Sequence, residues 1–178
     1  MIFPNMHNVR LLGLAIRARW LGFSALDARG HLLDWGLLFY QRRRSNELQS
    51  AKKRFEGLFD RTNPTVVVVV LPRLKTHEDI ITTRLIVRSL RSAASSLSVR
   101  IVRLRRDAIR AAFAPYNARS KHEIAVVLAQ LFPELGWKLP SERKIWTKED
   151  PKMAIFDALA GGVAYHKAKV GNTAPVSD

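Results

Sequence analysis

The stretch that decides the fold is VRLLGLAIRARWLGFSAL at residues 9–26, which predicts two short apolar strands joined by a basic turn. The turn signal Asp27-Ala28-Arg29-Gly30 follows it, and a third apolar run occupies residues 31–40. Three short strands connected by tight turns predict an antiparallel meander at the start of the domain.

Five consecutive valines in TVVVVVL, residues 65–71, form the clearest single strand signal. An unbroken β-branched run indicates burial on both faces, as in a strand inside a parallel part of a sheet. We therefore expect this strand to lie inside the sheet, beside the first strand and parallel to it. A further alternating strand is predicted at residues 98–104.

Helical periodicity accounts for most of the remaining chain. The predicted helices span residues 45–60, 77–97, 106–113, 120–132 and 151–169, and residues 133–150 form a loop. Inside the last helix, we expect Gly161-Gly162 to pack closely against the sheet. The order of elements predicts an α/β fold: a mixed five-stranded sheet of three antiparallel and two parallel strands, with helices on both faces. One domain is expected over residues 1–170, with a flexible tail at 171–178.

The charge balance indicates an anionic partner. The 178 residues include 30 Lys and Arg against 15 Asp and Glu, a net charge of +15 that favours nucleic acid. The chain has no cysteine, which excludes disulfides, thiolate zinc sites and a cysteine nucleophile, and favours a cytoplasmic location. No apolar run approaches the ~18 residues of a membrane span, so no membrane partner is expected.

Three segments together point to a known family. They are residues 99–110 as a strand followed by a short basic helix, Ser120-Lys121-His122-Glu123 at a helix start, and Asp157-Ala158-Leu159-Ala160 in the last helix. In this order and spacing, residues 9–168 resemble the RuvC-type Holliday-junction resolvases of the RNase H-like superfamily. The resemblance implies the RNase H-like sheet and a nuclease in which several carboxylates hold two Mg²⁺ ions.

The acidic site that the resemblance implies is mostly absent from this chain. The first-strand aspartate of the family falls on Ala15, and the glutamate at the end of the fourth strand falls near Val70, Leu71 or Pro72. In the last helix, Asp157 is retained, but the acid one turn earlier is replaced by Ala154. A single helix with one or two carboxylates makes a poor Mg²⁺ site.

Asp157 and Asp150 remain the only candidates for catalysis or metal binding. With Pro151 at the first helical position, Asp150 is better explained as the N-cap of the last helix. Asp157 is better explained as a relic whose charge is satisfied by a nearby basic group. If the chain is nevertheless a Mg²⁺ enzyme, one further acid must complete the site, with Asp34, Glu78 and Asp79 as the alternatives.

Basic side chains are the stronger functional signal, because many of them follow strand ends at the edge where this fold places its substrate. The predicted nucleic-acid-binding residues are Arg17, Arg19, Arg42, Arg43, Arg44, Arg73, Lys75, Arg105, Arg106, Lys121 and Lys144. Arginines in place of carboxylates convert a metal site into a phosphate site. In the loop, Trp137 and Trp146 can either stack on bases or cap the core, and capping is favoured.

These observations lead to one main hypothesis and two alternatives. The main hypothesis is a RuvC-like domain without nuclease activity that binds DNA through phosphate contacts and needs no cofactor. The first alternative is a divergent Mg²⁺-dependent Holliday-junction endonuclease. The second is a non-catalytic assembly subunit, either a homodimer or a partner of an active relative.

Overall fold

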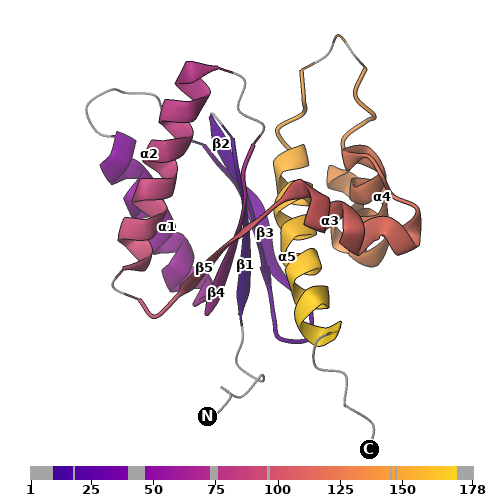
Figure 1. Cartoon of the computed structure of the whole chain (residues 1–178), viewed down its shortest axis with the longest axis horizontal. Helices are drawn as coiled ribbons and strands as arrows, with labels where there is room; N and C mark the ends of the chain where they lie inside the picture. The colour runs from indigo at the N-terminus through magenta and orange to yellow at the C-terminus, as the bar shows by residue number, and fades with distance from the viewer. Residues whose placement is uncertain are drawn as a thin grey trace, which may run out of the picture.

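A computed structural model of the chain describes residues 10–17, 19–39, 47–72, 76–95, 97–144, 146 and 148–171. Its centre is a five-stranded sheet in the order β3-β2-β1-β4-β5 (Figure 1). The strands are β1 (Leu11–Ile16), β2 (Trp20–Leu26), β3 (Leu32–Phe39), β4 (Val66–Val70) and β5 (Arg100–Leu104). β1, β2 and β3 pair antiparallel, whereas β4 runs parallel to β1 and β5 runs parallel to β4.

The valine strand lies inside the sheet between β1 and β5, which confirms its predicted position. All five valines are buried. Val66, Val68 and Val70 belong to the apolar core on one face of the sheet, and Val67 and Val69 to the core on the other face. The run is apolar throughout because both faces of β4 are covered.

Two layers of helices cover the sheet, as predicted (Figure 1). On one face lie α1 (Glu47–Thr62) and α2 (His77–Ala94), which pack against each other and share an apolar core with β1, β2 and β4. On the other face α5 (Met153–Gly171) lies across β1, β2 and β4, with α3 (Arg106–Phe113) and α4 (Lys121–Leu131) packed against it. None of the described helices is long and apolar enough to cross a membrane.

Several boundaries differ from the sequence prediction. The predicted loop at 133–150 begins with a 3₁₀-helix, η3 (Pro133–Lys138), and a second one, η2 (Ala114–Tyr116), follows α3. α5 starts at Met153 because the amides of Met153 and Ala154 bond to carbonyls only three residues back, which makes the preceding turn 3₁₀-like. α2 ends at Ala94, earlier than expected. The predicted start of α1 and the predicted tail beyond residue 171 lie outside the described residues.

Glycines allow α5 to lie unusually close to the sheet. A Cβ atom on Gly13 of β1 would be 2.2 Å from the carbonyl oxygen of Ala158, and one on Gly161 of α5 would be 2.5 Å from Cγ2 of Val70. Both distances are shorter than any side chain tolerates, so the close approach depends on glycine. The predicted packing of Gly161 against the sheet is confirmed, and it fixes where Asp157 lies relative to the end of β1.

Candidate functional site

Arg17 follows the last residue of β1 and turns toward α5. Its backbone amide donates to the carbonyl of Trp20 (3.0 Å), which closes the turn between β1 and β2, and its guanidinium donates to the carbonyl of Ile16 (3.3 Å). The side chain is only 11% exposed. A basic residue at this position therefore points into the molecule and is held there by the hairpin.

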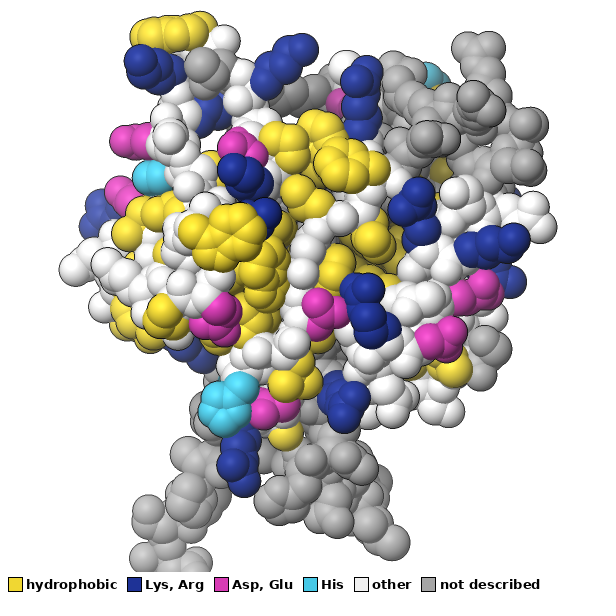
Figure 2. All heavy atoms as spheres, turned by 180° about the vertical axis from the view of Figure 1, so that it is seen from behind, with side chains coloured by type: hydrophobic (Ala, Val, Ile, Leu, Met, Phe, Trp, Pro, Cys, Tyr) yellow, Lys and Arg dark blue, Asp and Glu magenta, His cyan; other side chains and the backbone are white. Residues whose placement is uncertain are grey.

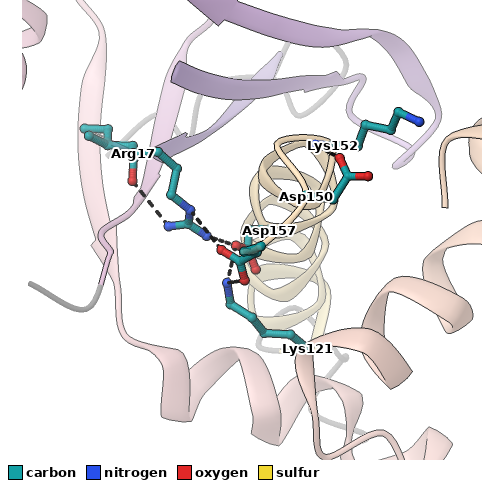
Figure 3. Close-up of polar contacts among 7 residues, drawn as sticks. Arg17, Lys121, Asp150, Lys152 and Asp157 are labelled. Carbon is teal, nitrogen blue, oxygen red and sulfur yellow. Dashed lines mark hydrogen bonds and ion pairs between the residues drawn. The ribbon is translucent and has the colours of Figure 1, made fainter. Parts of the chain in front are cut away.

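Asp157 is the first partner of Arg17, with which it forms a hydrogen-bonded ion pair. Lys121, the first residue of α4, also reaches this carboxylate, with 2.9 Å between Nζ and Oδ2. Figure 3 shows both cations pointing toward Asp157 from different elements. The retained acid of the last helix is thus satisfied by basic groups, as the sequence interpretation proposed.

Glu149 completes the group that we call the charge cluster: Arg17, Lys121, Glu149 and Asp157. Its Oε1 accepts a hydrogen bond from Lys121 Nζ at 2.7 Å, and its Oε2 lies 3.7 Å from Arg17 Nε. The cluster joins the end of β1, the start of α4, the segment before α5 and α5 itself. Two cations and two carboxylates balance one another within it.

A capping box places Lys121. The Ser120 hydroxyl accepts from the amide of Glu123, and the Glu123 carboxylate accepts from the amide of Ser120, so the start of α4 is fixed. Hydrogen bonds from the backbone amides of Ser120 and Arg119 lower the pKa of the Glu123 carboxyl. The sequence Ser120-Lys121-His122-Glu123 therefore serves two purposes, capping a helix and presenting a lysine to the cluster.

Burial and neighbouring charges perturb the protonation of the cluster. Burial lowers the pKa of Lys121 to about 8, with the positive charges of Arg17 and Arg106 acting in the same direction and Glu149 opposing them. Burial also lowers the pKa of Arg17, against the attraction of Glu149. Burial alone would raise the pKa of Glu149, but the hydrogen bond and charge of Lys121, with the charges of Arg17 and Arg106, hold it below its usual value.

A small cavity of about 40 Å³ adjoins the cluster between α3, α4 and α5. Its volume is close to that of one water molecule, so a nucleotide can only contact its rim. The charged residues around it are Arg106, Arg110, Arg119, Lys121 and Asp157. Lys121 and Asp157 pair with each other, so the attraction for an anion at this edge of the molecule comes from Arg106, Arg110 and Arg119.

The residues here do not fit the magnesium site that a nuclease of this fold requires. Ala15 pairs with Val70 in the sheet, and neither has an oxygen ligand in its side chain. Ala154, one turn before Asp157, also has none. Among the described residues, no group of three or more His, Asp or Glu side chains is arranged to hold a metal ion. The one retained acid is occupied by Arg17 and Lys121.

The alternative acids lie elsewhere. Asp150 is exposed, and its carboxylate accepts from the amide of Lys152 (2.8 Å), so it caps the turn before α5 (Figure 3). Asp34 on β3 pairs with Arg61 at 2.8 Å. Asp79 belongs to the capping box of α2, and the side chain of Glu78 lies outside the described residues.

The predicted basic residues separate into three groups. Arg17 and Lys121 belong to the cluster, and Arg106 lies beside it. Arg19 in the β1–β2 turn is exposed, and so is Arg105, which pairs with Asp107 at 3.3 Å. Lys144 lies in the loop before α5. Five predicted residues lie outside the described residues, namely Arg42, Arg43, Arg44, Arg73 and Lys75.

Sequence reasoning missed two participants and misjudged two tryptophans. Glu149 and Arg119 were not predicted to take part, whereas Arg110 belongs to the basic residues expected around the end of the fifth strand, and no sequence signal links Glu149 to a lysine 28 positions away. The prediction that Trp137 and Trp146 cap the core is wrong, because these side chains are 71% and 80% exposed. The loop after η3 projects away from the sheet and gives Trp146 no core to cover (Figure 1), and Trp137 contacts Trp35 of β3 while most of its surface stays in solvent.

No protein-family model matches the chain, and no curated protein matches it in sequence. Solved structures do match its fold. T. thermophilus RuvC in complex with a Holliday junction substrate is similar with a TM-score of 0.70 at 17% identity, covering 92% of this chain and 97% of that one. A structure of Thermus thermophilus RuvC gives a TM-score of 0.69 at 16% identity with the same coverage.

The yeast mitochondrial Holliday junction resolvase Ydc2 is similar with a TM-score of 0.66 at 12% identity, covering 93% of this chain and 82% of that one. Sequence identities this low establish a shared fold and not a shared activity. The strand order, the two helical layers and these matches agree. The chain has the RuvC-type RNase H-like fold.

Proposed function

We propose that this chain is a nucleic-acid-binding domain that has lost the metal-dependent nuclease chemistry associated with its fold. The observation that carries the proposal is the state of Asp157, which is engaged by both Arg17 and Lys121. A divalent cation at this position would have to displace two positive side chains and would gain no oxygen ligand from Ala15 or Val70. Repulsion and poor coordination both oppose metal binding.

The charge of the surrounding surface supports nucleic acid as the partner. The chain carries +15, and cations gather around the cavity beside the cluster. Arg110 and Arg119 are exposed there and are suited to contact phosphate oxygens. The solved T. thermophilus RuvC complex contains a Holliday junction, which makes branched DNA the first ligand to test.

Binding through phosphates has a measurable signature. Displacing condensed counterions makes the logarithm of the binding constant fall linearly with the logarithm of salt concentration, with a slope on the order of −4 to −7 for a handful of contacts. We expect the purified chain to bind a four-way junction and a duplex with such a slope. Fluorescence anisotropy across a salt series measures it.

A charge-reversed variant locates the contacts. Arg110→Glu combined with Arg119→Glu should weaken binding to every sequence and make the slope shallower by about 2, one for each lost phosphate contact. Arg88→Glu, an exposed position on α2 over the opposite face of the sheet, is the matched control and should leave the slope unchanged. Absence of binding to any nucleic acid, or an affinity insensitive to salt, would refute the proposal.

A further inference from the structure

Two large aromatic rings of the segment between α4 and α5 remain in solvent. Trp137 in η3 is 71% exposed, and Trp146 in the following loop is 80% exposed. Burying an aromatic ring is strongly favourable, so a protein rarely leaves two of its four tryptophans in water without a partner for them. The two rings therefore indicate a ligand that covers aromatic surface.

A lysine accompanies each ring. Lys138 Nζ lies 3.9 Å from the ring centroid of Trp137, and Lys144 Nζ lies 5.9 Å from that of Trp146. Trp35 on β3 also contacts Trp137 edge to face, with 6.1 Å between centroids, which orients the ring against the sheet. An aromatic face next to an ammonium group matches a nucleotide, which offers a flat base and an anionic phosphate.

Trp146 lies close in the chain to the charge cluster, three residues before Glu149. The loop that carries Trp146 extends past the end of the sheet where β1 and β4 end, the same edge that holds the charge cluster (Figure 1). Seen from the opposite side, hydrophobic side chains gather over the middle of the molecule, with Lys and Arg side chains among them (Figure 2). A nucleic acid bound at the cationic edge can therefore reach Trp146, whereas Trp137 lies against Trp35 of β3.

We propose that Trp137 and Trp146, each beside its own lysine, stack on unpaired bases of a single-stranded nucleic acid; together we call these two rings the platform. The inference rests on the proposed function and adds which part of the ligand this surface recognises. Bases in a duplex are already stacked and cannot cover the rings, so the platform selects unpaired segments. A second copy of the chain is a poor occupant, because it would bring another +15 charges against Lys138 and Lys144.

Two single-stranded ligands of equal length distinguish the contribution of base stacking from that of phosphate contacts. One is an oligothymidine and the other is the same sugar-phosphate chain without bases. The wild type should bind the oligothymidine at least tenfold more tightly, and only the oligothymidine should quench tryptophan fluorescence. Trp146→Ala should weaken binding to the oligothymidine about fivefold or more while leaving the abasic strand unchanged. Trp146→Phe, which keeps an aromatic face, should restore most of the loss.

Leu131→Ala, at another exposed apolar position on α4, is the matched control and should change neither affinity. Trp137→Ala should behave as Trp146→Ala does.

Equal affinity of the wild type for both strands, with salt-dependent binding intact, would overturn this inference and leave the proposed function standing. Loss of all nucleic-acid binding would overturn both. Sedimentation that shows a wild-type dimer and a monomeric Trp137→Ala, without nucleic acid, would identify the platform as a self-association surface and overturn the inference.

Discussion

The charge cluster and the loop with Trp146 lie at the same edge of the sheet but are built in opposite ways. In the cluster, Arg17 and Asp157 are 11% and 13% exposed and each charge has a partner within the protein. In the loop, Trp146 is 80% exposed and lies beside a lysine in solvent. The charges of the cluster join β1, α4 and α5, whereas the ring of Trp146 belongs to neither apolar core of the described residues.

This difference separates structural from recognition roles. A buried, balanced cluster stabilises the position of α5 and contributes little net charge to the surface. Exposed cations such as Arg110 and Arg119, together with the tryptophans, are the groups that a ligand meets first. Mutations in the cluster should therefore change stability, and mutations on the exposed surface should change binding.

The largest expected effect on the free energy of unfolding tests the close packing of α5 against β1, which positions Asp157 in the cluster. In Gly13→Ala, the new Cβ would meet the Ala158 carbonyl at 2.2 Å and must push α5 away from β1. We expect a loss of about 3 kcal/mol in the free energy of unfolding, the upper end for overpacking. Denaturant titration measures it. Gly57→Ala on α1, where nothing lies within 4 Å, is the control and should raise stability by up to about 1 kcal/mol.

The next effect tests the cluster itself. Asp157→Asn keeps the shape of the side chain but leaves Arg17 and Lys121 with only Glu149 as an acidic partner. We expect a loss of about 2 kcal/mol, less than for a fully buried pair that loses its partner, because Glu149 remains. Asp107→Asn, which breaks an exposed pair with Arg105, should have no measurable effect. Equal stability of Asp157→Asn and the wild type would contradict the structural role of the cluster.

A smaller effect concerns pH. The pKa of Lys121 is lowered from 10.5 in the unfolded chain to about 8 in the folded one. Between these values the unfolded chain holds a proton that the folded chain has released, so this group makes the free energy of unfolding rise with pH across that window. The stability of the wild type relative to Lys121→Met should increase from neutral pH to pH 10. Lys52→Met, on the surface of α1, is the control.

The smallest effect on the free energy of unfolding is expected from removing the exposed ring of Trp146. Trp146→Ala removes a side chain that covers no core, so its unfolding free energy should stay within about 0.5 kcal/mol of the wild type. Thermal denaturation measures this directly. A loss comparable to that of Asp157→Asn would mean that the ring is part of the packed structure, and the contrast between the two regions would fail.

The sheet could be predicted from the sequence because its signals are local. The valine run, the turn at residues 27–30 and the helical spacing each act over a few residues, and together they leave few possible topologies. Boundaries were less accurate where backbone hydrogen bonds decide them, as in the 3₁₀-like turn before Met153. Tertiary contacts, which no local pattern encodes, set the exact end of a helix.

The site was only partly predictable. Missing carboxylates at Ala15 and Ala154 follow from the family resemblance, residue by residue. The pairing of Glu149 with Lys121 and Arg17 does not, because it depends on how a loop and two helices meet in space. The exposure of Trp137 and Trp146 was also inaccessible, since amphipathic residues in a loop have no periodicity that reveals whether they face the core.

Cleavage of a four-way DNA junction in Mg²⁺ or Mn²⁺ tests the central claim most directly. T. thermophilus RuvC serves as the positive control, and the wild-type chain is compared with Asp157→Asn at matched amounts of bound junction. We expect binding without cleavage by both proteins and no rise in melting temperature with either metal. Multiple-turnover cleavage by the wild type that Asp157→Asn abolishes would show a working metal site and contradict the account.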